Sequence, residues 1–174
     1  MYSRIKLFGH PVHPMLVAYP IALYTSTVVA YLAYLIGGDT FWFKIAVVAN
    51  IAGVIMAAVT ALPGFIDWAT GIPSASPAKA HGLIHLLLNV GALVLFLINA
   101  IWHTGQFLAP APDRVGGFIL SLIGVGLTVG AGFLGWTMIQ RDHVGVDPLP
   151  STRYRERERV ERPDMEAPER GVPA

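Results

Sequence analysis

Four long runs without a charged side chain dominate the sequence. They cover residues 14–38, 45–66, 81–108 and 115–140. Each run is at least as long as the roughly 20 residues that an α-helix needs to cross the hydrocarbon core of a bilayer. None has the polar face that a helix of a soluble bundle turns toward water. The pattern therefore predicts four membrane-spanning helices, at about residues 14–36, 43–66, 81–104 and 115–139.

The composition agrees with this pattern and narrows the chemistry. Hydrophobic residues make up 54% of the 174 residues and charged residues 13%, against about a quarter in an average globular protein. Cysteine is absent, which excludes disulfides, thiolate metal sites and cysteine nucleophiles. We expect an all-α integral membrane four-helix bundle over residues 1–147, with a lipid bilayer as its surroundings and no nucleic acid partner.

The chain changes character after Asp147. Residues 148–174 contain six arginines, five glutamates and one aspartate, with few apolar side chains between them. A segment of this composition cannot bury enough apolar surface to offset the entropy of folding. We expect residues 148–174 to be a disordered cytoplasmic tail.

Basic residues near the ends of the runs predict the orientation. One side of the membrane would hold the N-terminus, the loop between the second and third helices and the C-terminus, and the other side the two remaining loops. The first side carries more basic residues, namely Arg4, Lys6, Lys79, Arg141, Arg153 and Arg155, against Lys44 and Arg114 on the second. Since basic residues favour the cytoplasmic side, we expect both termini in the cytoplasm.

Histidines mark the ends of the runs. His10 and His13 precede the first run, His81 and His85 open the third, and His143 follows the fourth. In the predicted topology these five lie at one membrane face, and only His103 lies at the other. Ionisable groups at membrane depth are costly and usually have a function. The alternative is that they are interfacial anchors or hydrogen-bonded caps that bind no cofactor.

Polar or small residues follow one face of three predicted helices. In the third helix an arc of about 80° contains His81, His85, Asn89, Asn99 and His103. In the first, an arc of about 60° contains His13, Pro20, Tyr24, Thr27 and Tyr31. The fourth has a stripe of small residues, Gly117, Ser121, Gly124, Thr128, Gly132 and Gly135. These faces indicate close helix packing and interhelical hydrogen bonds, or, for the glycines, room for the edge of a flat cofactor.

Two cofactor chemistries fit the histidines. Axial ligands of one haem must approach from opposite faces of the ring and hence from different helices, which His13 and His85 can do; His10 with His81 could repeat the arrangement. His81 and His85, one helical turn apart, could instead bind a single ion. With Asp67 and His143, the imidazoles would make a mononuclear site for iron, zinc or copper, and its candidate ligands are His13, His81, His85, His143 and Asp67.

Several motifs resemble those of a known family. The motifs are the opening Gly9-His10-Pro11-Val12-His13-Pro14, the stretches from Pro63 to Asp67 and from His85 to Asn89, and the end with Gly135-Trp136 and the run from Arg141 to Val146. They are similar to the motifs of a family of uncharacterised bacterial four-span membrane proteins classed as a domain of unknown function. The resemblance covers about residues 8–147, and His81 is not part of its motifs. It implies a bacterial inner membrane and, because members sometimes accompany a Rieske iron–sulphur domain, electron transfer. This chain cannot hold such a cluster itself, since it has no cysteine.

We interpret the chain as a membrane redox component, more than a stand-alone enzyme, that holds haem b, or a bare metal ion, near the cytoplasmic face. His13 and His85 would be the axial ligands, His10, His81 and His143 secondary ligands or proton carriers, and Asp67 and Asn89 would orient imidazoles. A quinone or an iron–sulphur protein would exchange electrons with it, and the glycine stripe would permit a homodimer. The alternative is a non-enzymatic protein that conducts protons or a small solute, or scaffolds a partner.

Overall fold

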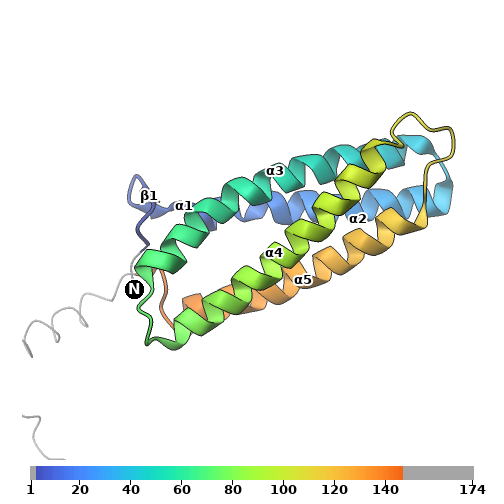
Figure 1. Ribbon diagram of the computed structural model, residues 1–174. Coiled ribbons are helices and arrows are strands. Elements are labelled where there is room, and N and C mark those ends of the chain that lie inside the picture. The colour runs from blue at the N-terminus through green and yellow to red at the C-terminus, as the bar shows by residue number, and fades with distance from the viewer. Residues whose placement is uncertain (1–2, 147–174) are drawn as a thin grey trace, which may run out of the picture.

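The fold is an all-α membrane bundle of four long helices. The computed structural model describes residues 3–146 and arranges them as antiparallel helices joined by short loops (Figure 1). The helices are α1 (Val12–Leu16), α2 (Ala18–Gly37), α3 (Thr40–Gly71), α4 (Pro77–Thr104) and α5 (Val115–Gln140). The segment of α1 and α2 and each of α3, α4 and α5 are long and apolar enough to cross a membrane. The four predicted spans are thereby confirmed, while the predicted tail lies outside the described residues.

Helix boundaries differ from the predicted ones where charged residues lie inside a helix. The predicted second span ended short of Asp67, whereas α3 runs from Thr40 to Gly71 and contains both Lys44 and Asp67. Asp39 caps α3 by accepting a hydrogen bond from the Phe41 amide at 2.9 Å. Charged side chains near the ends of a membrane helix can reach the interface, so a charge there does not end the helix.

Two further differences concern the helix starts and the N-terminal segment. The third span begins at Pro77 with Ser76 as its cap, four residues before the predicted start. The Ser76 side-chain oxygen accepts a hydrogen bond from the Ala78 amide. A small antiparallel hairpin, not predicted, precedes α1 and pairs β1 (Lys6–Leu7) with β2 (His10–Pro11). Phe8 and Gly9 turn the hairpin with positive φ angles of 49° and 82°.

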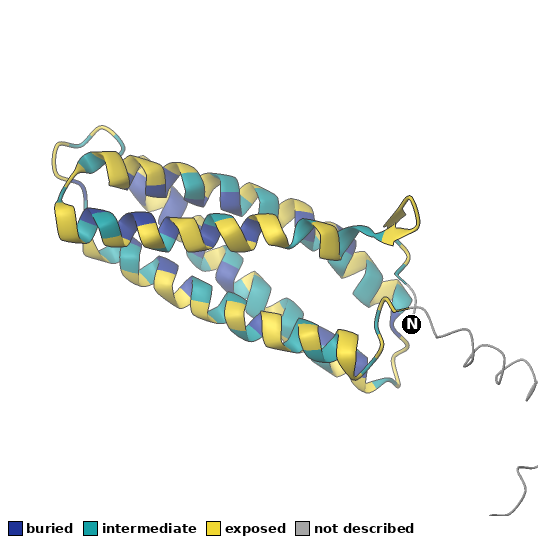
Figure 2. Cartoon of the chain, turned by 180° about the vertical axis from the view of Figure 1, so that it is seen from behind, coloured by how far each residue is buried: buried dark blue, intermediate teal, exposed yellow. Residues whose placement is uncertain are grey.

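Large apolar side chains cover the outside of the bundle, as expected for lipid-facing helices. Figure 2 shows that exposed and buried positions alternate along every long helix. The tightest apolar cluster lies near the α2–α3 turn and contains Ala30, Tyr31, Tyr34, Phe43, Ala46 and Val47. At the other end α3 and α4 diverge (Figure 1). The two ends of the bundle therefore differ in how closely the helices approach.

The two helical hairpins, α1–α3 and α4–α5, repeat one another. Tyr24 on α2 lies where a Cβ on Gly53 would clash, and Phe96 on α4 lies likewise against Gly124. Phe96 follows Tyr24 by 72 residues in the sequence, and Gly124 follows Gly53 by 71. Such a constant offset between structurally matching residues indicates an internal repeat.

Equivalent residues of the two repeats touch each other at three levels. Tyr24 stacks on Phe96 with ring centroids 3.6 Å apart. Tyr31 contacts its equivalent, His103, at 5.5 Å, and His13 contacts its equivalent, His85, at 6.3 Å. A residue can meet its own counterpart only at a two-fold axis. The bundle therefore has an approximate two-fold axis along its length, with the pair His13 and His85 at one end and the pair Tyr31 and His103 at the other.

Candidate functional site: a histidine pair on the two-fold axis

The candidate site consists of His13 and His85, which the two repeats place opposite each other. His13 lies on α1 and His85 on the third turn of the long helix α4. Their ring centroids are 6.3 Å apart and their ring planes are inclined by 83°. Both side chains are half-buried. The prediction that these two imidazoles come together from different helices agrees with this geometry.

Each imidazole is held by a backbone carbonyl of the second helix in its own repeat. The Nδ1 atom of His13 lies 2.9 Å from the Thr60 carbonyl oxygen, and that of His85 lies 2.8 Å from the Ala131 carbonyl oxygen. A carbonyl oxygen only accepts hydrogen bonds, so both Nδ1 atoms must be the donors. In the neutral rings the lone pair then resides on Nε2. The two repeats therefore present a matched pair of Nε2 atoms.

Two glycines allow these contacts. Gly64 lies one turn after Thr60, and a Cβ there would come within 2.6 Å of the His13 Nδ1 atom. Gly135 occupies the same place one turn after Ala131, where a Cβ would lie 3.4 Å from the His85 ring. The His13 ring can reach the Thr60 carbonyl because Gly64 leaves the helix surface bare, whereas a Cβ on Gly135 would make only an ordinary contact with His85. The fit is tighter around His13 than around His85.

Asn89 contacts His85 at Nε2, and not at the second ring nitrogen through which it was expected to orient the imidazole. Its Nδ2 atom donates to the His85 carbonyl oxygen at 2.8 Å and lies 3.2 Å from the His85 Nε2 atom. An amide N–H can approach Nε2 only as a donor, which again makes Nε2 the unprotonated nitrogen. A metal at Nε2 would replace this weak contact, and Asn89 would keep its bond to the backbone.

The other metal-ligand candidates are engaged elsewhere. His81 Nδ1 lies 2.8 Å from Asp142 Oδ2, and His10, in the hairpin, directs its Nδ1 to the Phe8 carbonyl oxygen at 3.0 Å. His143 follows α5 with a positive φ of 54°. Within residues 3–146, no three histidine, aspartate or glutamate side chains are grouped closely enough to hold a metal ion. The predicted mononuclear site of several imidazoles and a carboxylate therefore does not form in the described part of the chain.

Asp67 binds the N-terminal segment. Its carboxylate accepts hydrogen bonds from the Ser3 hydroxyl at 2.6 Å and from the Arg4 and Ile5 amides at 2.7 and 3.1 Å. The segment before the hairpin is thus fastened to the end of α3. The sequence showed the membrane face of Asp67 but not the backbone amides that reach it, and its role beside an imidazole stays a prediction.

Two glycines of the α5 stripe serve aromatic packing. A Cβ on Gly117 would clash with the Tyr31 ring at 2.5 Å, and one on Gly124 would clash with Phe96 at the same distance. Close approach of helices is the role that small residues usually have in membranes. The sequence did not predict that Gly64, Gly135 and the carbonyls of Thr60 and Ala131 form the second layer of the site. The repeat offset of 71 or 72 residues, already present in the sequence, was the signal that could have found them.

The fold and the site define a class: a four-span membrane protein of two repeated helical hairpins, each contributing one histidine to a pair at one end. Residues 9–148 match the family described as predicted membrane protein, DUF2231. The match covers most of the chain, and the protein belongs to this family. Comparisons with curated proteins and with solved structures gave no match.

Proposed function

We propose that the protein is a membrane electron carrier that binds one haem b between His13 and His85. The observation that carries the proposal is the pair of equivalent imidazoles on the two-fold axis, each with Nδ1 bonded to a carbonyl oxygen. Haem iron needs two ligands that approach from opposite sides of a flat ring, and a two-fold axis supplies that relation. Histidine is an established axial ligand of haem iron.

The spacing of the rings fits this group. Metal–imidazole bonds are about 2 Å long, so an iron between two Nε2 atoms places the ring centres roughly 6 Å apart. The separation of 6.3 Å between the His13 and His85 centroids agrees with that requirement. The absence of a larger ligand cluster among residues 3–146 favours haem over a bare ion, because two protein ligands leave an isolated zinc or copper ion short of donors.

The surrounding residues would tune the site. Haem iron, when bound, supplies the exchange of one electron. The carbonyls of Thr60 and Ala131 fix the orientation of both rings and increase the basicity of their Nε2 atoms by accepting from Nδ1. His81 lies one helical turn from His85, toward the end of the bundle, and shares a hydrogen bond with Asp142. This pair is placed to exchange protons with water when the charge of the site changes. A quinone or a separate iron–sulphur protein would be the electron-transfer partner.

The first prediction concerns haem content. Full-length protein expressed with haem available and purified in mild detergent should contain one haem b per chain, with a Soret band and a reducible low-spin visible spectrum. Pyridine haemochrome analysis measures the ratio. Folded protein that carries stoichiometric iron, zinc or copper without haem would replace haem with a bare-metal site. Folded protein without either would contradict the redox function and leave a scaffold or proton conductor.

The second prediction concerns orientation. We propose a bacterial inner membrane with the N-terminus and the α3–α4 loop in the cytoplasm, supported by the excess of basic residues on that side. Because the chain has no cysteine, single cysteines report their own positions. Leu108→Cys, in the α4–α5 loop and 87% exposed, should react with an impermeant thiol reagent added to intact cells. Ser74→Cys, in the α3–α4 loop, should react only after permeabilisation. Exchange of the two results would reverse the orientation, and equal labelling of both from outside would contradict the four-span topology.

A further inference from the structure

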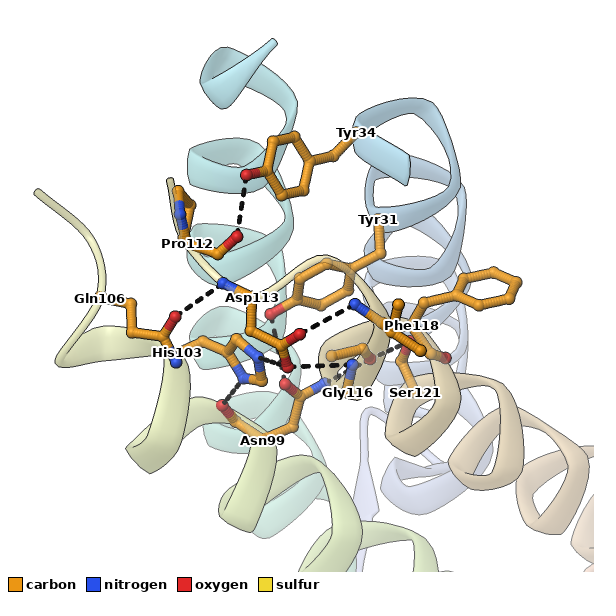
Figure 3. A network of polar contacts seen from close by, with 12 residues as sticks. Tyr31, Tyr34, Asn99, His103, Gln106, Pro112, Asp113, Gly116, Phe118 and Ser121 are labelled. Carbon is orange, nitrogen blue, oxygen red and sulfur yellow. Dashed lines mark hydrogen bonds and ion pairs between the residues drawn. The ribbon is translucent and has the colours of Figure 1, made fainter. Parts of the chain in front are cut away.

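A second polar network lies at the end of the bundle opposite the histidine pair (Figure 3). His103, near the end of α4, is fully buried, and its ring contacts Tyr31 at 5.5 Å and Trp102 at 5.0 Å. Asp113, just before α5, faces it, with Asp113 Oδ2 3.6 Å from His103 Nε2. The Asp113 side chain is 32% exposed. A buried imidazole thus adjoins a carboxylate that reaches water.

The hydrogen bonds around His103 fix the position of one of its protons. Its Nδ1 atom lies 2.9 Å from the Asn99 carbonyl oxygen, which only accepts, so Nδ1 must carry a hydrogen. Its Nε2 atom is buried and makes no hydrogen bond with any described residue. In a neutral ring this nitrogen would direct its lone pair at the Asp113 carboxylate. Two electron-rich atoms facing each other repel, whereas a proton on Nε2 turns the contact into an attractive one.

The carboxylate of Asp113 binds the start of α5. Its Oδ1 accepts from the Val115 amide at 3.1 Å and its Oδ2 from the Gly116 amide at 3.0 Å. These are the free N–H groups at the start of α5, where the helix dipole also stabilises a negative charge. A proton shared by the two side chains would then lie on His103 and make the pair an imidazolium next to a carboxylate.

The other charged and titratable side chains at this end of the bundle have hydrogen bonds or ring contacts of their own. From α2, the Tyr31 hydroxyl donates to Asn99 Oδ1, and the Tyr34 hydroxyl donates to the Pro112 carbonyl oxygen. Lys44 of α3 lies over the Phe107 ring at 5.9 Å, and Arg114 lies over the Tyr34 ring at 5.2 Å. Both cations thus contact aromatic rings.

The repeat provides an internal comparison. Tyr31 is the counterpart of His103 in the first repeat, and Asp39 caps α3 as Asp113 caps α5. The first repeat therefore has the same carboxylate cap with a tyrosine in place of the imidazole. Only the second repeat joins a cap to a group that can take up a proton near neutral pH.

We propose that His103 and Asp113 form a proton-binding site at the membrane face opposite the histidine pair. Water at the α4–α5 loop delivers a proton past Asp113 to His103 Nε2, and the bond that forms is the N–H of the imidazolium. The site requires no haem and is independent of the proposed electron transfer. It gives the bundle a place to hold a proton inside one membrane face, and loss of that proton at higher pH would weaken the contact between α4 and the start of α5.

The third prediction tests this site by nuclear magnetic resonance of the full-length protein with ¹⁵N-labelled histidine. The His103 signals are identified by their loss in His103→Gln. At neutral pH both ring nitrogens of His103 should carry protons, and in Asp113→Asn only Nδ1 should, since asparagine can still cap α5 but is neutral. Asp39→Asn, the matching change in the first repeat, should leave His103 unchanged.

Two results would overturn the proposal. One is a wild-type His103 ring with a single proton at neutral pH, and the other is an Asp113→Asn variant whose ring keeps both protons. If Asp113→Asn does not fold, the wild-type protonation state alone decides.

Discussion

Replacement of either His13 or His85 by alanine should remove the low-spin haem spectrum. Each histidine would supply one of two axial ligands, so either loss leaves the iron with one protein ligand and either frees the haem or converts it to a high-spin form. The measurement is the visible spectrum and haem content of each purified variant. His10→Ala is the matched control, because His10 lies in the exposed hairpin, where its Nδ1 atom is directed to the Phe8 carbonyl oxygen.

A rescue experiment separates ligation from folding. In His13→Gly, added imidazole should restore the low-spin spectrum, since a free imidazole can occupy the space of the missing ring. A folded variant that lacks one of the two histidines but keeps the wild-type spectrum would contradict the assignment of the ligands. A variant that neither folds nor recovers with imidazole would show that the residue is needed for packing, and the other histidine would then decide the question.

The second large effect is expected at Gly64. Gly64→Ala places a Cβ within 2.6 Å of His13 Nδ1, where the ring cannot remain. His13 should move off the Thr60 carbonyl, and haem affinity should fall roughly 10- to 100-fold, as it does when the partner that orients a metal-bound histidine is lost. Gly135→Ala puts its Cβ at an ordinary 3.4 Å from His85, so its haem affinity should stay near that of the wild type. Haem titration of the two variants measures the difference.

Gly53→Ala controls for overpacking as such. A Cβ there would lie 2.7 Å from the Tyr24 ring, close to the middle of the axis and away from both histidines. We expect a loss of about 1–3 kcal/mol in stability, the usual cost of an overpacked core, with the low-spin spectrum retained. Equal loss of haem in Gly64→Ala and Gly135→Ala, or loss in Gly53→Ala, would indicate that the spectrum reports general stability and not the position of His13.

The sequence predicted the membrane spans well because their signal is physical and local. An uncharged run long enough to cross a bilayer is compatible with few structures other than a membrane-spanning helix. The C-terminal end of α3 was misplaced because Asp67 ends an uncharged run without ending the helix. The hairpin at residues 6–11 was missed because it depends on a turn of two residues with positive φ, of which only Gly9 favours that conformation.

The proximity of His13 and His85 was predictable, but the groups that hold the two rings were not. His13 and His85 were identified because the predicted topology places them on different helices at one membrane face, and a helical wheel places each on the polar face of its helix. The Thr60 and Ala131 carbonyls could not be identified in this way, because every residue has a carbonyl and only the register of neighbouring helices selects one. His103 was set aside for lying at the other face. Its role emerges only once Asp113 and Asn99 are placed beside it.

The most direct test of the central claim is the electron paramagnetic resonance spectrum of the oxidised, full-length protein at its measured haem content. One haem b per chain held by His13 and His85 predicts a low-spin ferric signal, and the inclination of 83° between the two rings predicts that it is strongly anisotropic. The signal should disappear in both alanine variants and persist in His10→Ala. A high-spin ferric signal from the wild type, or folded wild-type protein with no haem, would contradict the account.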